Sequence, residues 1–373
     1  MALLGDMYRG VVRGLNMRLA CLACILTSHA VAQVHRTRYV PSDAEIHSIL
    51  EERIDGQHQS VGIVVGVIDS AGPRIISYGA LDAHDPRCLD GDTIFEIGSL
   101  TKVFTALLLT EKVQRGEVAL DNPVSKYLPV PSSTTLQDLA TNTSGLPRNP
   151  ANLVPKDRAN PFAGYTRQLL LAALPAEVRP HWEYSNLGYG LLGQALAPDY
   201  ERAIVSGIAV PLGMDSTGIA LGPEEKARLA AGHDEHLAPA PSSDFGALAA
   251  AAGLRSSATD LLKFLSAFLG YTKTPLAPAM AAMLAVREPT TQPGLVNALG
   301  WQISTPDALE IVWKDGATAG FTSFLGCNPR ARVGVVVLSN TSNSRGVNDI
   351  GMHILDGASP LFQLPHRAAV DIK

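Results

Sequence analysis

Runs of apolar and alternating residues occur at both ends of the chain. Near the start, Val61–Asp69 and Arg74–Gly79 flank a turn-forming Ser-Ala-Gly-Pro sequence and together predict a β-hairpin. Near the other end, further strand-like runs follow one another with short turns between them: Leu299–Ser304, Leu309–Lys314, Phe321–Cys327 and Val333–Asn340. Short turns between consecutive strands predict antiparallel pairing.

A helical period replaces this pattern in the middle of the chain. Leu100–Gln114 places its large apolar residues on one stripe, which predicts an amphipathic helix. Asp260–Leu269 predicts a second helix, opened by a capping box that begins at Ser257, and Val347–Leu355 predicts a third. The Pro- and Ala-rich stretch Leu237–Ala252 predicts a loop or a close-packed connection.

Strands at both ends with helices between them predict an α+β fold. We expect one antiparallel sheet, built from the two chain ends and flanked by helices, with an inserted helical lobe and a cleft beside it. The sheet lobe would comprise residues 40–98 and 290–373, and the mainly helical lobe residues 99–289.

Residues 1–32 have the pattern of a secretory signal peptide. Three arginines precede the apolar run Leu19–Leu26, and small residues lead to the expected cleavage site after Ala32. The apolar run is far shorter than the ~20 residues of a membrane span, so we expect no stable membrane anchor. The pattern predicts a periplasmic or secreted protein; the alternative is an N-terminal tail that is retained.

Four cysteines are too few for a disulfide-built scaffold. Cys21 and Cys24 form a C-x-x-C inside the apolar run and would be removed with the signal peptide. Cys88 and Cys327 would remain. The sequence leaves open whether these two pair in an oxidising compartment or stay as buried thiols, because bridge geometry depends on the fold.

Composition excludes several classes of function. With 46% hydrophobic residues the chain can bury a sizeable core, which excludes global disorder. The 30 Lys and Arg against 35 Asp and Glu give a net charge of −5, so there is no broad basic face and nucleic acid is not an expected partner. The size suggests an enzyme, and we expect a monomer.

The first candidate for chemistry is Ser99-Leu100-Thr101-Lys102, at the head of a predicted helix. Residues three apart share a helix face, so a neutral Lys102 amine can take the proton of the Ser99 hydroxyl. A helix N-terminus also supplies N–H groups for a developing oxyanion. The pattern is weak alone, since about one S-x-x-K is expected by chance in such a chain. Without context, a serine cap beside an exposed lysine explains it better.

Two further motifs supply that context. Tyr184-Ser185-Asn186 is the only Y-x-N in the chain, and a tyrosine beside cations can carry protons. Lys314-Asp315-Gly316 lies where one predicted strand leads into the next, and small residues there let a substrate approach the backbone. The N–H group of Ala317 can complete an oxyanion hole with that of Ser99.

The motifs and their surroundings resemble the penicillin-recognising serine hydrolases, which include class C β-lactamases, low-molecular-weight D-Ala-D-Ala peptidases and related carboxylesterases. FEIGSLTKVFTALLL resembles the segment around the nucleophile of class C enzymes, and DLATNTSGLP is similar to a loop common in the family. YSN matches the Tyr-x-Asn motif, and LGWQI resembles the strand before the third motif. The resemblance runs from about Val61 to Leu355 and implies the two-lobed α+β fold.

The resemblance implies a role for each matching residue. Ser99 would be the acylated nucleophile, Lys102 its activating base and Tyr184 the proton relay.

Substrate contacts are implied as well. Asn186 would contact a substrate amide, and Lys314 would hold both the tyrosine and the anionic end of the substrate. Asn343, and with it Arg345, falls where the family often places further contacts to the substrate carboxylate; an exposed loop explains this segment equally well.

We therefore expect a class C-like serine hydrolase that cleaves β-lactam amides through acyl-Ser99, without metal or other cofactor. One alternative is a D-Ala-D-Ala carboxypeptidase/endopeptidase or a carboxylesterase with the same machinery. The other is a non-hydrolytic penicillin-binding receptor. Tyr184 argues against the receptor, because slow deacylation would follow from loss of that group.

One residue, Asp315, departs from the family pattern, and one further segment, His233–His236, lies outside the family motifs. The family usually has a Thr or Ser hydroxyl after the lysine of the third motif, whereas this chain has Asp315, a carboxylate that would repel an anionic β-lactam. Strand alternation also permits Asp315 to face away from the cleft. The sequence His233-Asp234-Glu235-His236 has no third metal ligand at useful spacing, so we expect a solvated loop there.

Overall fold

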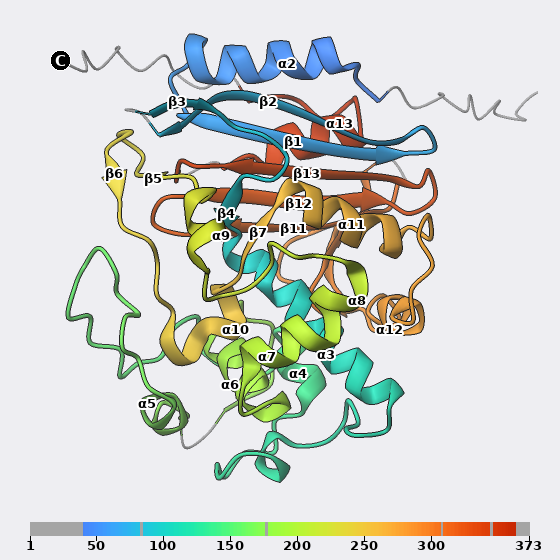
Figure 1. Ribbon diagram of the computed structural model, residues 1–373. Helices are drawn as coiled ribbons and strands as arrows, with labels where there is room; N and C mark the ends of the chain where they lie inside the picture. Colours follow the sequence, from blue (N-terminus) through green and yellow to red (C-terminus); the bar gives the residue numbers. More distant parts are fainter. Residues whose placement is uncertain (1–39, 83–84, 176–177, 307–308, 344–345, 363–373) are drawn as a thin grey trace, which may run out of the picture. The chain divides into compact units, whose positions relative to one another are not determined.

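The computed structural model describes residues 40–82, 85–175, 178–306, 309–343 and 346–362. The predicted signal peptide, residues 1–32, lies outside the described residues. The described chain has an α+β fold in which a large antiparallel sheet is flanked by helices (Figure 1). This confirms the predicted fold class.

The sheet is built from both ends of the chain and has nine strands over the described residues. Strand β1 (Gly62–Asp69) lies between β2 (Gly72–Asp82) and β13 (Val333–Ser339) and pairs antiparallel with both, so early and late parts of the chain meet inside the sheet. The strand order is β3 (Asp85–Cys88), β2 (Gly72–Asp82), β1 (Gly62–Asp69), β13 (Val333–Ser339), β12 (Thr322–Asn328), β11 (Ile311–Ala317), β10 (Gln302–Ser304), β9 (Leu295–Asn297) and β8 (Glu288–Pro289).

Helices cover both faces of the sheet. On one face, α2 (Asp43–Glu51) and α13 (Asn348–Leu355) pack on a core that includes Val65 of β1. On the other face, α11 (Ala258–Phe268) packs on a core that includes Val64. Successive side chains of a strand point to opposite faces, so β1 contributes to both cores and is buried along almost its whole length.

The remaining helices gather on the α11 side of the sheet (Figure 1). They are α3 (Thr101–Gln114), α4 (Leu136–Thr141), α5 (Arg167–Ala172), α6 (Asn186–Leu196), α7 (Tyr200–Ile204), α8 (Val210–Leu212), α9 (Pro223–Ala227), α10 (Ala249–Ala252) and α12 (Ala277–Ala282). Two short ladders accompany them: β4 (Ile94–Glu96) with β7 (Arg255–Ser257), and β5 (Gly232–His233) with β6 (Pro239–Ala240).

Two predicted segments differ from the observed elements. The strand predicted from Leu299 begins only at Gln302, because Gly300 has a φ of +78° and interrupts the extended backbone. The stretch Leu237–Ala252 is not loop throughout, because its last residues form α10. That short helix packs against α6 and α3 and, as shown below, reaches the candidate site.

The helix predicted from Asp260 begins earlier, at Ala258. Ser257 is its N-cap and accepts the Asp260 N–H, as the capping pattern predicts. The Asp260 carboxylate does not return this bond among the described contacts. It accepts instead from the Ser216 N–H (2.7 Å) and the Thr217 hydroxyl (2.9 Å), because these donors of a neighbouring loop face it in the interior.

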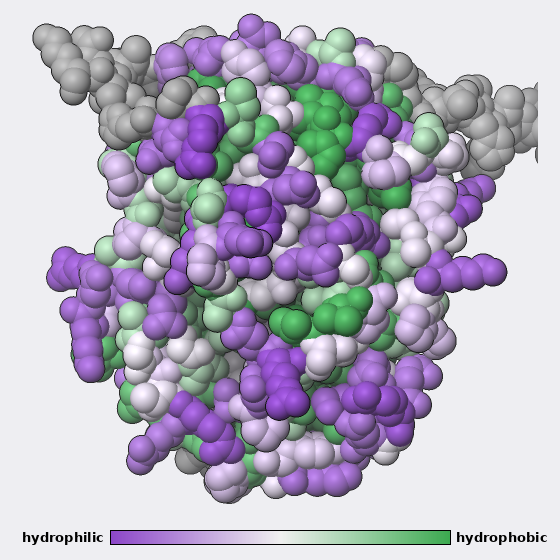
Figure 2. All heavy atoms as spheres, viewed as in Figure 1, coloured by the Kyte–Doolittle hydropathy of each residue, from purple (hydrophilic) through white to green (hydrophobic). Residues whose placement is uncertain are grey.

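Polar side chains dominate the face of the molecule seen in Figure 2, with apolar groups in small patches between them. This distribution agrees with the two buried apolar cores. Within the ranges that the structure describes, we find no helix long and apolar enough to cross a membrane.

Candidate active site

Ser99 lies in a 3-10 turn, Gly98–Leu100, between β4 and α3. Gly98 has a φ of +49°, and a Cβ there would lie 2.7 Å from the Ala317 N and O atoms. A Cβ on Gly316 would lie 2.9 Å from the Ser99 N atom. Both approaches require glycine, so this pair of glycines brings the Ser99 backbone beside the end of β11. The oxyanion hole of Ser99 and Ala317 N–H groups stays a prediction.

Lys102, on the first turn of α3, points at Ser99. Its Nζ atom donates to Ser99 Oγ (3.1 Å), Asn186 Oδ1 (2.9 Å) and Ala251 O (2.8 Å). The side chain is buried, and this burial is the main reason that the pKa of Lys102 falls from 10.5 to about 8. A lysine with a pKa of about 8 is neutral in roughly a tenth of the molecules at pH 7 and in about half at pH 8, and the neutral amine can accept a proton.

Tyr184 is the second neighbour of Ser99. Its hydroxyl donates to Ser99 Oγ over 2.7 Å, and the centroid of its ring lies 4.8 Å from Lys102 Nζ and 5.2 Å from Lys314 Nζ. Burial raises the pKa of Tyr184, but the two ammonium groups and the hydrogen bond to Ser99 outweigh burial and lower the pKa from 10.0 to about 8. Both neighbours of Ser99 Oγ can therefore exchange protons with it.

A third cation also contacts the tyrosine ring. Arg148 lies in the loop before α5, and its Cζ atom is 5.0 Å from the centroid of the Tyr184 ring. The same loop holds the tyrosine segment in place: Asn142 adopts a left-handed backbone (φ +60°), its side chain accepts the Ser185 N–H, and Arg148 O accepts the Asn186 N–H.

Lys314 and Asp315 form an ion pair in the middle of β11. Lys314 Nζ donates to Asp315 Oδ1 (2.7 Å) and to Asp315 O (3.0 Å). The other carboxylate oxygen, Oδ2, accepts from Asn348 Nδ2 (3.2 Å) at the start of α13. Burial raises the pKa of Asp315, but Lys314 and the hydrogen bonds outweigh it and lower the pKa to about 2, so this carboxylate is ionised.

The structure brings four of the seven predicted site residues into direct contact around one point: Ser99, Lys102, Tyr184 and Asn186. Lys314 lies against the Tyr184 ring, and Ala317 lies against Gly98.

Asn186 and Asn343 make contacts within the protein. Asn186 Oδ1 accepts from Lys102, and its Nδ2 donates to Asn149 Oδ1 (3.0 Å). Asn343 Oδ1 accepts from the Gly346 N–H (2.5 Å), and its Nδ2 donates to Gln59 O (3.4 Å). The predicted contacts of both side chains with substrate stay predictions, and Arg345 lies outside the described residues.

Several residues of this cluster were missed by sequence reasoning. Ala251 contributes only a backbone carbonyl, which has no signature in the sequence. Arg148 and Asn149 follow directly on the DLATNTSGLP segment, so that resemblance could have pointed to them. Asn348 is brought to Asp315 by the packing of α13 against the sheet, which the sequence does not reveal.

The expected solvated loop at His233–His236 is wrong for His233. This residue is fully buried in β5, with Nδ1 at 3.1 Å from Asn340 O and Nε2 at 3.3 Å from Asp82 Oδ1. His236 is exposed, as expected. No group of three His, Cys, Asp or Glu side chains suited to a metal ion is found in the described part of the chain.

The two cysteines outside the signal-like segment are both free thiols. Cys327 is buried in β12, whereas Cys88 is exposed in β3. The structure therefore has the unpaired arrangement, with Cys327 buried as expected, but the expectation of a buried thiol is wrong for Cys88, which lies on the edge strand of the sheet.

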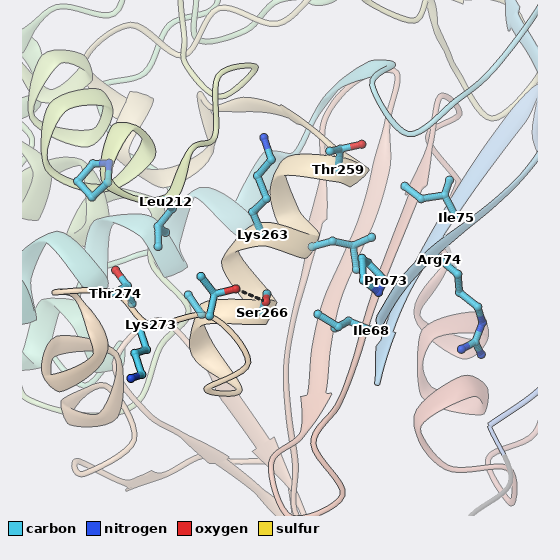
Figure 3. Close-up of a pocket in the computed structure, with 14 residues that line it drawn as sticks. Ile68, Pro73, Arg74, Ile75, Leu212, Thr259, Lys263, Ser266, Lys273 and Thr274 are labelled. Carbon is cyan, nitrogen blue, oxygen red and sulfur yellow. Dashed lines mark hydrogen bonds between the residues drawn. The ribbon is translucent and has the colours of Figure 1, made fainter. Parts of the chain in front are cut away.

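A hollow of about 440 Å³ lies between α11, α8 and the β1–β2 hairpin (Figure 3), and it is larger than the space of about 10 Å³ lined by Lys102, Tyr184 and Lys314. Its walls are formed by apolar residues such as Ile68 and Leu212, with hydroxyl groups from Ser266 and Thr274. The Lys263 ammonium at its edge is paired with Asp260 rather than with a serine or threonine of the hollow. The chemistry therefore points to Ser99, not to the larger hollow.

Comparisons with known proteins agree with this geometry. Residues 47–358 match the beta-lactamase family. The chain is 27% identical to the D-alanyl-D-alanine-carboxypeptidase/endopeptidase AmpH of Escherichia coli (strain K12), over 91% of this chain and 96% of that protein. It is 27% identical to a beta-lactamase of Pseudomonas fluorescens, over 76% of this chain and 89% of that protein. Its fold is similar to a class C beta-lactamase of Rhodobacter sphaeroides, with a TM-score of 0.72 and 26% identity over 84% and 97% of the two chains.

Proposed function

The chain belongs to the beta-lactamase family and is a serine hydrolase of class C-like type, and on this basis we propose that it cleaves β-lactam amides through an acyl-Ser99 intermediate. One observation carries the proposal. Ser99 Oγ lies within hydrogen-bond distance of both Lys102 Nζ and Tyr184 Oη, and both groups have a pKa lowered to about 8.

The proposed reaction has two matching halves. Ser99 Oγ attacks the carbonyl carbon, and its proton passes to the Lys102–Tyr184 pair. The N–H groups of Ser99 and Ala317 stabilise the tetrahedral oxyanion. The C–N bond then breaks and the leaving nitrogen takes a proton from Tyr184. In the second half, a water molecule loses a proton to the same pair and attacks the ester carbon. The bond between that carbon and Ser99 Oγ then breaks, and Ser99 Oγ takes the proton back from the pair.

The similarity to AmpH favours a second candidate, a D-Ala-D-Ala carboxypeptidase/endopeptidase, because that alignment covers nearly the whole of both chains. The same serine and the same Lys102–Tyr184 pair can cleave a peptide bond as well as a β-lactam amide. A receptor that stays acylated is disfavoured, because Tyr184 is in place to activate the hydrolytic water.

The test is covalent labelling followed by turnover. A fluorescent penicillin should label Ser99, identified by peptide mapping, and Ser99→Ala should abolish both the label and the turnover of nitrocefin. Ser266→Ala, a serine in the larger hollow, is the matched control and should change neither. Label at another residue, or turnover retained in Ser99→Ala, contradicts the proposal. A D-Ala-D-Ala peptide and p-nitrophenyl butyrate, assayed alongside, decide between the candidate substrates.

We also propose that the protein is exported. Residues 1–32 direct the protein to the periplasm or out of the cell, where it acts as a monomer on a small-molecule substrate. N-terminal sequencing of the exported protein should find a chain that begins at or near Gln33. A chain that keeps Leu19–Leu26 after export contradicts this assignment.

A further inference from the structure

The ammonium group of Lys314 is already engaged by the carboxylate next to it. Its Nζ donates to Asp315 Oδ1 and to Asp315 O, and its side chain is 5% exposed. The Asp315 side chain is 42% exposed, so negative charge lies at the surface beside the buried cation. The cation that resemblance assigns to an anionic substrate group is therefore half of an internal ion pair.

Asn348 fixes this pair from the other side. Its Nδ2 donates to Asp315 Oδ2, while Lys314 takes Oδ1, so both carboxylate oxygens have a partner. Asn348 is the first residue of α13, which packs on β12 and β13. The carboxylate is thus held in one position by a side chain on β11 and another on a packed helix.

The pair is close to the reacting atoms. Lys314 Nζ lies 5.2 Å from the centroid of the Tyr184 ring, and the Tyr184 hydroxyl lies 2.7 Å from Ser99 Oγ. Tyr184 is the proposed proton donor to the leaving group, so the leaving group of the substrate lies on this side. Any charge carried near the scissile bond on that side meets Asp315 as well as Lys314.

We propose that the Lys314–Asp315–Asn348 cluster selects substrates whose leaving-group side is uncharged, and discriminates against those with a carboxylate there. A carboxylate would have to displace Asp315 from Lys314 or lie beside an ionised carboxylate, and like charges at such a distance repel. An ester or a carboxyl-blocked amide needs neither. This inference rests on the proposed acyl-Ser99 reaction.

The test compares a chromogenic cephalosporin with its methyl ester at the ring carboxylate, following ring opening in both. The wild-type protein should open the ester with a kcat/KM at least about tenfold above that of the free acid. Asp315→Asn keeps the size and removes the charge, so it should raise the value for the free acid about tenfold and leave that for the ester within about threefold. Any change in Tyr184 protonation affects both substrates alike, so their ratio isolates the charge effect.

The outcomes separate the two proposals. Equal rates for acid and ester in the wild type, or equal changes for both in Asp315→Asn, overturn the selectivity but leave the acyl-enzyme intact. If neither the free acid nor the ester forms a covalent adduct with Ser99, the proposed function itself is overturned. Asp315→Thr serves as a second variant, and labelling of Ser99 by a fluorophosphonate shows that each variant is folded.

Discussion

At Ser99, two neighbouring groups share the proton that the proposed reaction moves. Lys102 Nζ lies 4.8 Å from the centroid of the Tyr184 ring, and both groups bond to Ser99 Oγ. The Lys102 cation favours the tyrosinate, and the tyrosinate favours the lysine cation. Loss of one proton from the pair therefore creates the proposed base.

The first prediction is a rise of kcat/KM with pH. It should increase as pH passes through about 8, because deprotonation of the pair produces the active form. Lys102→Ala and Tyr184→Phe should each lower kcat by ~10²–10⁴, the usual range for a general acid–base group. In Lys102→Ala the remaining rise should move to higher pH, since the lysine charge lowers the pKa of Tyr184.

Steady-state kinetics on the two single variants and the double variant check this. The effects on kcat should not add, because the two groups act as one unit. A kcat/KM that stays flat from pH 6 to pH 10 would falsify the assignment of the pair as the base.

The second prediction concerns Arg148. Its charge lowers the pKa of Lys102, so Arg148→Gln should raise that pKa and move the rise of kcat/KM to higher pH. The side chain is exposed, and a cation over an aromatic ring at such a site contributes about 0.5–1 kcal/mol, so the loss near pH 7 should be about two- to fivefold.

Arg148→Lys is the control, because it keeps the charge over the ring. It should keep the wild-type pH profile when both variants are assayed with one neutral substrate. If both substitutions shift the profile equally, Arg148 acts through loop structure rather than through charge.

Some residues of the candidate site could be predicted from the sequence and others could not. The short motifs indicated Ser99, Lys102 and Tyr184 as candidates, and the structure brings these three side chains into contact. Ala251 could not be found in this way, since a carbonyl oxygen 149 positions along the chain from Lys102 has no side-chain signal. The burial of His233 also depends on partners from distant segments, Asp82 and Asn340, which no local pattern predicts.

At the scale of elements, close backbone contacts set the geometry of the site. The turn at Gly98 meets the end of β11 at Gly316, as described above. Helix α6 meets α10 in the same way, since a Cβ on Gly193 would lie 2.2 Å from Ala250 Cβ. The second contact holds α10 against the helix that begins at Asn186, with the Ala251 carbonyl at Lys102.

The third prediction tests the turn. Gly98→Ala places a Cβ 2.7 Å from the Ala317 backbone at a φ of +49°, so it combines backbone strain with a clash. Gly116→Ala is the matched control, because Gly116 has a φ of +71° and nothing within 4 Å of the added atom. Both variants should lose about 1–2 kcal/mol of unfolding free energy through strain.

Gly98→Ala should lose about 1–3 kcal/mol more through overpacking, and with it the labelling of Ser99. Urea denaturation and labelling with a fluorescent penicillin measure the two effects. Equal losses of stability and full labelling in both variants would show that the turn tolerates a side chain.

Most helices and strands could be predicted from the sequence, and helix α10 shows why some could not. Alternation and turn residues located the β1–β2 hairpin, and the helical period located α3. Helix α10 has four residues, all alanine, so it shows neither a period nor a polar cap. It forms because the small side chain of Ala250 fits closely against Gly193 of α6, a tertiary effect.

At the scale of the whole molecule, both ends of the described chain meet beside the central strands. β1 pairs with β13, and Arg53, just after α2, pairs with Asp349 of α13 across 296 positions of sequence. The Arg53 and Asp349 side chains are 4% and 1% exposed, and their closest N–O distance is 2.5 Å. Asp349 follows Asn348 directly, so this buried pair also anchors the helix end that holds Asp315.

The last prediction follows from the cost of a lone buried charge. Arg53→Met leaves the buried Asp349 side chain without its partner and should lower the free energy of unfolding by about 3–5 kcal/mol. The double variant Arg53→Met/Asp349→Asn removes both charges and keeps an acceptor for the Phe362 N–H, so it should lose less than the sum of the two single variants.

The control is an exposed ion pair. Arg287→Met breaks an equally well-formed pair with Glu310 whose side chains are 44% and 37% exposed, and it should cost at most about 1 kcal/mol. Urea denaturation of the four variants decides the matter: similar losses in Arg53→Met and Arg287→Met would mean that α13 is held by its apolar contacts alone.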